Sequence, residues 1–262
     1  MNDTAMTPNK IIVCIKPVVL SASGGTARST DSYELNPFDR PALEVALQMK
    51  EKRGGTVIVV AMGPEPSAFV LNEAMAMGAD AGILLCDRAL AGADTLATST
   101  TLAAAMKKLL PVDLILFGTR SADSDTGHVG PQTAVLLDLP LVTGISSVDA
   151  LRNGLRVERR IDDFQEEYEV SFPAALTIHP GAARPRDIGL LGMVPAFEER
   201  KLTIWGLKDL GLSPDRVGES GSATAVLSLS KTQRTRMCEF ITGPTDDQVD
   251  RLLDRLLASG LL

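Results

Sequence analysis

The sequence predicts a mostly parallel, doubly wound α/β sheet with helices on both faces and an extended arm at the C-terminal end. Short apolar runs rich in β-branched residues recur along the first half of the chain, each close to a Gly, Pro or Asp cluster. Longer segments with helical spacing separate these runs, and this alternation is typical of parallel βαβ units. The predicted strands are Ile11–Ile15, Thr56–Ala61, Gly82–Leu85 and Leu114–Phe117.

Three helices are expected between and after these strands. The first, Pro41–Arg53, begins with a residue suited to a first helical turn and ends at Gly54. The second covers Pro66–Met77. The third, Asp94–Leu109, opens on a carboxylate that can cap its N-terminus.

The pattern changes in the second half of the chain. A run at Leu141–Val148 is followed by Leu155–Ile161 and Glu167–Ser171, which alternate in the manner of antiparallel strands around a charged bend. Ala174–Ile178 is one more short buried run. These segments predict a sheet edge or cap.

The last third of the chain, from Gly181, is rich in Gly, Pro and charge and has weak periodicity. It ends on Thr245–Gln248, a capping-box pattern that opens a helix. The apolar face of this helix carries Val249, Leu252, Leu253, Leu256 and Leu257. That face predicts a docking surface, either for the chain's own domain or for another subunit.

The composition excludes several classes of function. Lys and Arg number 26 against 33 Asp and Glu, whereas a nucleic-acid groove needs clustered cations. Cys14, Cys86 and Cys238 have no CxxC spacing and no histidine cluster, so reduced, buried thiols are expected and neither a disulfide framework nor a metal site. Met1–Lys10 has no apolar signal core and no apolar run is long enough to span a membrane, which predicts a cytoplasmic protein without membrane insertion.

The most informative loop, Gly118–Pro131, follows a buried strand and leads into a helix that is expected to start near Pro131. Small residues let main-chain N–H groups approach an anion, Ser124 and Thr126 can donate hydroxyls, and the helix N-terminus adds the positive end of its dipole. These features predict a phosphate cradle. A plain polar turn is the alternative, because the loop is neither a P-loop nor a dinucleotide fingerprint.

Two further segments stand at helix starts. Asp94, Thr95 and Thr98 place a row of polar groups where a ligand could meet them, although capping alone would explain Asp94. Leu35–Asp39 offers an Asn amide and an aspartate to an adenine or ribose, although capping would also explain the aspartate. Lys16 either points toward the same crevice or is simply solvated.

No catalytic side chain is predicted. His128 and His179 are the only histidines, and no nucleophile elbow, zinc-protease helix motif or P-loop lysine occurs. His128 lies inside the phosphate-type loop and can contact a ligand, but a lone loop histidine is more often structural or solvated. Acid–base hydrolysis is therefore not expected.

Several segments in a fixed order, spread over nearly the whole chain, form a family pattern. They are Val13–Val18, Leu35–Asp39, Ala42–Lys52, Met62–Pro64, Glu73–Asp80, Asp94–Ser99, Asp123–Pro131 and Val157–Asp162. In this order they resemble the electron-transfer flavoprotein β subunits, including the nitrogen-fixation-associated members. The resemblance implies a Rossmann-like, adenine nucleotide alpha hydrolase-like fold and an electron carrier without classical catalytic residues, because the flavin ring does the redox chemistry.

The resemblance also implies an adenine nucleotide in this subunit. The nucleotide is AMP in common respiratory members and a second FAD in electron-bifurcating members; Asp87–Ser99 and Asp123–Thr126 look like the bifurcating type, so FAD is expected with AMP as the alternative. The residues that the resemblance assigns to the cofactor are Cys14, Asn36, Pro37, Phe38, Asp39, Met62, Asp94, Thr95, Thr98, Gly118, Thr119, Arg120, Ser121, Ala122, Asp123, Ser124, Asp125, Thr126, Gly127, His128 and Val129.

The same resemblance implies the partners. A larger α subunit that holds an electron-carrying FAD would complete a heterodimer, which would serve flavin-dependent dehydrogenases and a quinone oxidoreductase or ferredoxin. Pro185-Arg186 and Leu190 resemble the segment that leads into the family's dehydrogenase-recognition loop, so Leu190 is the expected partner-binding residue. Residues 1–190 are then the nucleotide-binding domain, and residues 191–262 form a partner-recognition segment with the arm.

The sequence also departs from the family pattern. Val157–Glu166 lacks the family's glycine, and Gly192–Ala196 differs from the usual lysine-rich continuation. A nucleotide-binding module without a redox role is one alternative function. An ATP-cleaving synthetase of similar fold is another, but Ser23–Gly25 comes late for its loop and lacks the Asp-Ser that would follow.

Overall fold

The computed structural model describes residues 10–19, 33–151, 154–198, 202–228 and 238–262. By its internal contacts the chain divides into two units, Met1–Ala225 and Val226–Leu262, which are described separately. The helices of the first unit are α1 (Arg40–Arg53), α2 (Ala68–Met77), α3 (Thr95–Leu109), α4 (Val129–Leu136), α5 (Leu190–Glu198) and α6 (Leu207–Leu210), and its short 3₁₀ turns are η1 (Glu65–Ser67), η2 (Arg88–Leu90) and η3 (Pro214–Arg216). The second unit contains α7 (Thr245–Ala258).

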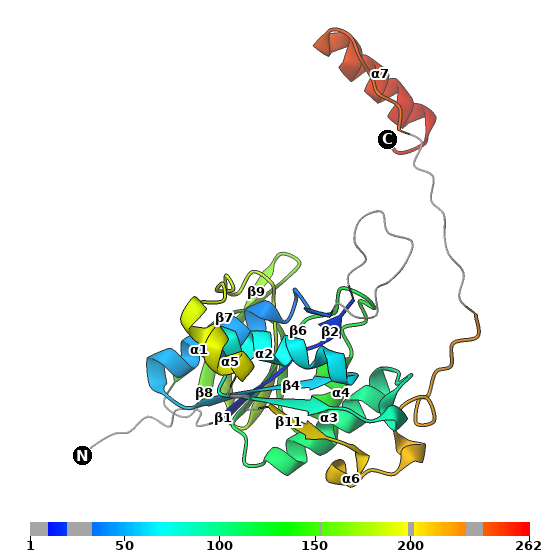
Figure 1. Ribbon diagram of the computed structural model, residues 1–262. Helices are drawn as coiled ribbons and strands as arrows, with labels where there is room; N and C mark the ends of the chain where they lie inside the picture. The colour runs from blue at the N-terminus through cyan, green and yellow to red at the C-terminus, as the bar shows by residue number, and fades with distance from the viewer. Residues whose placement is uncertain (1–9, 20–32, 152–153, 199–201, 229–237) are drawn as a thin grey trace. The chain divides into compact units, whose positions relative to one another are not determined.

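A nine-stranded sheet runs through the first unit (Figure 1). Its strands are β1 (Lys10–Cys14), β4 (Thr56–Met62), β5 (Ala81–Leu85), β6 (Leu114–Gly118), β7 (Leu141–Leu151), β8 (Gly154–Ile161), β9 (Phe164–Ser171), β10 (Ala174–Ile178) and β11 (Leu202–Trp205). Their order in space is β11-β5-β4-β1-β6-β10-β7-β8-β9. Neighbours from β11 to β7 are parallel, whereas β7, β8 and β9 pair antiparallel. A separate antiparallel ribbon joins β2 (Pro17–Val18) to β3 (Glu34–Leu35).

Continuous apolar runs explain why the central strands are buried on both faces. Ile11, Ile12 and Val13 of β1 are each at most 1% exposed, as parallel strands between two helical layers require. Because successive side chains of a strand point to opposite faces, Ile11 and Val13 pack with α1 and α2, and Ile12 packs with α3, α4 and α6. The predicted doubly wound fold is confirmed.

The elements predicted from the sequence are confirmed in type, with small shifts in their bounds. α1 begins at Arg40 rather than Pro41, and the second predicted helix opens as the 3₁₀ turn η1 before it continues as α2. α4 begins at Val129, two residues before the expected start. The antiparallel edge predicted for the second half is the β7–β8–β9 meander. The expectation of an edge position is wrong for Ala174–Ile178, because β10 lies between β6 and β7 and pairs in parallel with both.

Several short elements were not predicted, among them α5, β11 and α6. β11 pairs in parallel with β5 at one edge of the sheet, and Leu207 of α6 joins the core on the α3 side. Their few residues carry too little periodicity to reveal them in the sequence. Internal contacts divide the chain after Ala225. The functional boundary expected after residue 190 stays a prediction.

The predicted C-terminal helix exists, but its expected capping box is wrong. Thr245 is the first residue inside α7 rather than its cap, Pro244 stands at the cap position, and Gln248 Nε2 instead donates to the Gly243 carbonyl at 2.6 Å. Within its own unit the apolar face is exposed: four of its five predicted members, Val249, Leu252, Leu253 and Leu257, are between 44% and 60% exposed.

The three cysteines are free thiols, but they are not all buried. Cys14 is buried and Cys86 half-buried, whereas Cys238 is exposed, so the expectation of buried thiols is wrong for Cys238. In the described ranges, no helix combines the length and the apolar character that a membrane crossing needs.

The central strands should dominate stability. Leu116 of β6 is fully buried, so Leu116→Ala should lower the free energy of unfolding by about 2–5 kcal/mol through lost burial and the cavity left behind. Val135→Ala, at a side chain that is 76% exposed, is the control and should change it by less than about 0.5 kcal/mol. Urea denaturation measures both; an equal effect of the two variants would contradict the assignment of the core.

Candidate functional site

The predicted binding residues gather where the parallel strands end. β1 lies between β4 and β6, and the chain runs outward to β4 and β5 on one side before it crosses to β6 on the other. In open α/β sheets such a switch point opens a crevice at the carboxyl ends of the strands. Cys14, Met62 and Gly118 are the last residues of β1, β4 and β6 and therefore lie at the edge of the sheet where this rule places a ligand.

Asp39 ties the ends of β1 and β6 together. It stands before α1 but makes no capping hydrogen bond, so the capping interpretation is wrong. Its Oδ2 instead accepts the Lys16 backbone N–H at 2.7 Å, and the Gly118 backbone N–H also bonds to this carboxylate. Burial raises the pKa of Asp39 to about 7, although the bonds from Lys16, Asn36 and Gly118 act to lower it.

Gly118 is needed at this place because there is no room for a side chain. A Cβ on Gly118 would lie 2.3 Å from Asp39 Oδ1 and 2.5 Å from the Phe38 carbonyl oxygen. The strand end and the segment before α1 are therefore in backbone contact. This close approach fixes where the long loop after β6 begins.

Asn36 shapes that loop from the other side. Its amide Nδ2 donates to the Arg120 carbonyl at 2.9 Å, and its Oδ1 accepts the Ala122 N–H at 3.2 Å. The side chain is 1% exposed, so both bonds are shielded from water. In this arrangement Asn36 organises the loop, and the loop in turn carries the groups that face the crevice.

Lys16 points to the loop, so the interpretation of a simply solvated lysine is wrong. Its Nζ lies 2.7 Å from Asp123 Oδ1 and 3.2 Å from Ser124 Oγ. Burial raises the pKa of Asp123, but the bonds from Lys16 and Ser121 outweigh it and hold this pKa below its usual range. Lys16 and the loop residues predicted for the cofactor are thus in direct contact.

Arg120 supplies a second cation in the loop. Its guanidinium carbon lies 4.4 Å from the centre of the Phe38 ring, and its Nη1 lies 3.3 Å from Asp125 Oδ1. Arg120 and Lys16 are therefore each balanced by one loop carboxylate. An incoming phosphate would compete with Asp123 and Asp125 for these cations.

The starts of α3 and α4 are joined by one hydroxyl. Ser99 Oγ donates to the Thr95 carbonyl at 2.7 Å and lies 3.2 Å from the Val129 carbonyl, so the first turn of α3 meets the first turn of α4. The hydroxyls of Thr95 and Thr98, both half-buried, make no hydrogen bond to any described residue. Two helix N-termini and two available hydroxyls therefore lie side by side.

Asp94 is fully used in structural contacts. Its Oδ1 accepts the Ala97 N–H at 2.9 Å, which confirms the predicted cap, and its Oδ2 accepts the N–H and the hydroxyl of Thr224 at 3.0 and 3.1 Å. Thr224 and Ser222, whose Oγ accepts the Asp94 N–H at 2.8 Å, belong to a segment that sequence reasoning missed. Its only signal was a richness in Gly and Ser.

The other predicted residues are placed less closely. His128 is exposed at the cap position of α4 without a capping bond, and Gly127 has the left-handed φ of 66° that glycine tolerates. Burial, followed by the charge of Asp39, raises the pKa of the Cys14 thiol, which therefore stays neutral.

Leu190, the predicted partner-binding residue, begins α5, which packs on α2. Ser23–Gly25 lies outside the described residues.

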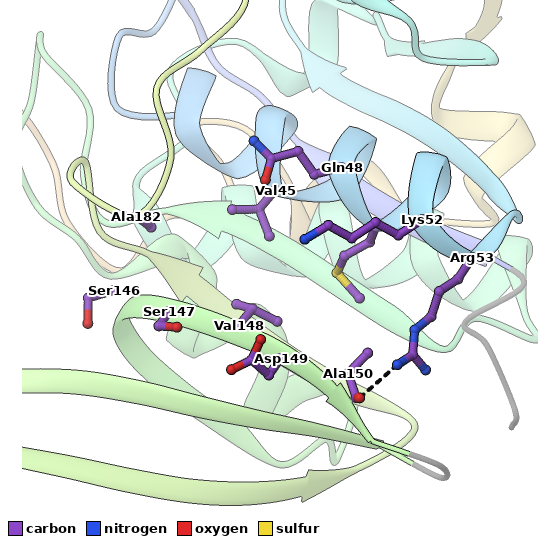
Figure 2. A pocket seen from close by; sticks show the side chains of 11 residues that line it. Val45, Gln48, Lys52, Arg53, Ser146, Ser147, Val148, Asp149, Ala150 and Ala182 are labelled. Carbon is purple, nitrogen blue, oxygen red and sulfur yellow. Dashed lines mark hydrogen bonds between the residues drawn. The ribbon is translucent and has the colours of Figure 1, made fainter.

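A cavity of about 310 Å³ lies elsewhere, between α1 and β7, and Figure 2 shows the side chains around it. Val45, Gln48 and Lys52 line one side, and Arg53 donates to the Ala150 carbonyl at 2.8 Å at its end. No predicted cofactor residue borders it. We assign the site to the strand-end crevice because the glycine-rich loop and two helix starts meet there.

The crevice is suited to binding rather than acid–base catalysis. Backbone N–H groups, hydroxyls and two cations are the donors that a nucleotide phosphate uses. In the part of the chain that the structure describes, no group of three His, Cys, Asp or Glu side chains could hold a metal ion.

The raised pKa of Asp39 gives a pH-dependent stability. Because it lies above the ordinary value of 3.8, the stabilising contribution is fully present below about pH 4 and is lost as the pH rises through about 7, with a slope of up to about 1.4 kcal/mol per pH unit. Asp39→Asn should lack this loss between about pH 4 and pH 7 in urea denaturation. Asp125→Asn controls for the removed charge; an unchanged pH dependence in Asp39→Asn would refute the assignment.

Comparison with known proteins identifies the family of the chain. The family model for the electron transfer flavoprotein domain matches residues 24–201. The chain is 40% identical to the caffeyl-CoA reductase-Etf complex subunit CarD of Acetobacterium woodii, over 92% of this chain and 94% of that protein. It is 39% identical to an electron transfer flavoprotein subunit beta of Thermoanaerobacterium thermosaccharolyticum, over 85% of each chain, and 36% identical to protein FixA of Azotobacter vinelandii, over 90% and 89%. The chain therefore belongs to the electron transfer flavoprotein family, as an electron-transfer subunit of the β type.

Proposed function

We propose that this subunit holds FAD in the strand-end crevice and works in an electron-bifurcating heterodimer, with AMP as the alternative ligand. The observation that carries the proposal is the junction of the α3 and α4 starts through Ser99, with the Thr95 and Thr98 hydroxyls beside it. AMP needs protein contacts only to its adenine, its ribose and its single phosphate. A second helix start with available hydroxyls suits a longer ligand with a pyrophosphate.

The residues of the crevice fit such a ligand. Gly118 and Gly130 let the two ends of the loop pack closely on the rest of the protein, since a Cβ on Gly130 would press on Phe117 and Thr177 at 3.1 Å. Lys16 and Arg120 are the cations that could offset phosphate charge once they leave Asp123 and Asp125. When bound, FAD supplies the redox chemistry through its isoalloxazine ring, and these residues would bind and orient it.

The partners follow from the same proposal. A larger α subunit with its own electron-carrying FAD would complete the heterodimer, and flavin-dependent dehydrogenases and a quinone oxidoreductase or ferredoxin would exchange electrons with it. The name of the A. woodii relative, which places that protein in a caffeyl-CoA reductase complex, supports a CoA-ester reductase or dehydrogenase as one partner. Leu190 is the proposed contact, supported by its exposure of 84% at the start of α5.

We place this complex in the cytoplasm. The three free thiols support this location, because reducing compartments keep cysteines unpaired.

The threonine hydroxyls test the identity of the ligand. Thr95→Val with Thr98→Val should release one of two flavins per heterodimer and spare the flavin of the α subunit, because only the crevice loses donors. Thr100→Val is the matched control on the same helix, since its hydroxyl already bonds to the Leu96 carbonyl at 2.9 Å. Flavin absorbance per purified heterodimer is the measurement. One flavin and one AMP in the wild type would refute the FAD proposal and leave a respiratory-type subunit.

The apolar face of α7 tests the heterodimer. Removal of Thr245–Leu262 should weaken association with the α subunit, because each apolar side chain contributes roughly 1.5–3 kcal/mol when fully buried. Leu252→Asp with Leu253→Asp should act in the same direction, and Asp250→Asn is the control on the same helix. Analytical ultracentrifugation of the co-expressed subunits measures this; an unchanged dissociation constant after truncation would exclude a role for α7.

A further inference from the structure

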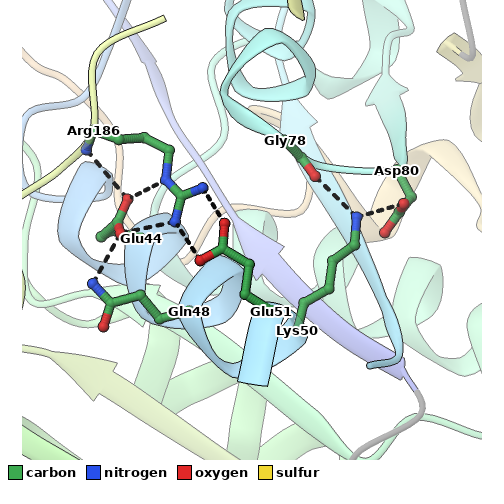
Figure 3. Close-up of polar contacts among 7 residues, drawn as sticks. All are labelled: Glu44, Gln48, Lys50, Glu51, Gly78, Asp80 and Arg186. Carbon is green, nitrogen blue, oxygen red and sulfur yellow. Dashed lines mark hydrogen bonds and ion pairs between the residues drawn. The ribbon is translucent and has the colours of Figure 1, made fainter. Parts of the chain in front are cut away.

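Arg186 holds two carboxylates of α1 at once (Figure 3). Its Nε and Nη2 donate to the two oxygens of Glu44 at 2.8 and 3.0 Å, and its backbone N–H also reaches Glu44 Oε2 at 3.2 Å. Its Nη1 and Nη2 also donate to the two oxygens of Glu51. Glu44 and Glu51 are two helical turns apart and therefore share one face of α1. We call these three residues the Arg186 clamp.

The clamp depends mainly on its buried member. The Glu44 side chain is 5% exposed, and an unpaired carboxylate in such a place would be costly. Burial raises the pKa of Glu44, but hydrogen bonds from Arg186 and Gln48 outweigh it and hold this pKa below its usual range. Only a bidentate guanidinium can serve both carboxylates with paired bonds. The backbone at residue 186 is therefore fixed to α1.

α5 begins four residues after Arg186 and is fixed to a second helix. A Cβ on Gly192 would lie 2.2 Å from the Ala76 carbonyl oxygen, so the α5 backbone touches the α2 backbone. Phe197 of α5 packs on Phe69 of α2, with ring centres 5.7 Å apart. The clamp and this contact together determine where the start of α5 lies.

The side of α5 that this anchoring leaves exposed is apolar. Leu190 is 84%, Val194 58% and Met193 43% exposed, and Phe69 of α2 is 54% exposed. Exposed large apolar side chains that lie together usually mark a surface that binds another protein. Its position is set by contacts to α1 and α2, none of which involves a residue predicted to bind the cofactor.

We infer that Arg186 is a positioning residue for partner docking: it fixes residues 187–198 so that Leu190 meets the electron-donating dehydrogenase in one orientation. This inference rests on the proposed function of Leu190. Arg186 touches neither the crevice nor the proposed docking side chains, so it acts through the backbone that it anchors. Without the clamp, docking would first have to order the segment, and the apparent affinity would fall.

The experiment uses the purified heterodimer as the electron acceptor of an acyl-CoA dehydrogenase that reduces the wild type. Arg186→Met should raise the KM for the heterodimer about tenfold and leave kcat and flavin content unchanged. It should also speed amide hydrogen exchange in residues 187–198. Arg186→Lys keeps the positive charge but loses the paired guanidinium hydrogen bonds, so its KM should lie between those of the wild type and Arg186→Met.

Lys50→Met is the matched control. Lys50 lies on the same helix and joins it to Asp80 at 2.6 Å and to the Gly78 carbonyl at 3.1 Å, away from residue 186 (Figure 3). This variant loses one ion pair of α1 but should leave KM and the exchange of residues 187–198 as in the wild type. Glu51→Gln, which removes only the exposed partner of the clamp, should raise KM about two- to threefold even if Arg186→Met folds poorly.

A double variant separates positioning from general destabilisation. If Arg186 acts through Leu190, Arg186→Met with Leu190→Ala should raise KM by less than the product of the two single effects. A wild-type KM and unchanged hydrogen exchange in both Arg186→Met and Glu51→Gln would overturn the inference. A KM of the double variant that equals the product of the two single effects would overturn it as well. A wild-type heterodimer that no acyl-CoA dehydrogenase reduces would instead refute the proposed function, and hydrogen exchange alone would then decide on the clamp.

Discussion

The contact of the Asp39 carboxylate with the backbone N–H groups of Lys16 and Gly118 is the constraint on which the crevice depends. It joins the ends of two central strands that are about a hundred residues apart in sequence. With that junction closed, Asn36 can reach the loop backbone and Lys16 can reach Asp123. The charge is buried at a cost, which the raised pKa of Asp39 expresses, and such costs are common at binding sites.

The sheet could be predicted because its central strands have a distinctive sequence pattern. Runs such as Ile11–Ile15 and Leu114–Phe117 are apolar without interruption, and only strands between two helical layers need that. The loop after β6 stood out in the sequence because glycines and hydroxyl side chains gather directly after a buried strand, and its role in binding phosphate stays a prediction. The tertiary contacts of the site could not be predicted from the sequence. Asp39 bonds to the end of β6 rather than capping α1, and Ser99 joins two helix starts. Both contacts depend on tertiary packing and leave no local sequence pattern.

The elements that escaped prediction are those whose stability comes from contacts with distant segments. β11 has four residues and exists because the edge of β5 offers it backbone partners. Ser222 and Thr224 reach the start of α3 through hydrogen bonds to Asp94, and their own segment has no periodicity. α7 is the opposite case: its apolar spacing predicted the helix, and within its own unit four residues of its apolar face are exposed.

The proposed nucleotide site and the proposed docking surfaces differ in chemistry. The residues at the strand ends are polar, cationic and rich in glycine, whereas the exposed parts of α5 and α7 are apolar. The central claim is that the junction of the α3 and α4 starts receives a pyrophosphate. Electron density from the purified heterodimer tests it most directly. We predict an adenine dinucleotide whose phosphates lie at Thr95, Thr98 and the Gly118–Gly130 loop; a mononucleotide that ends at the loop and leaves the threonines without a ligand would contradict the account.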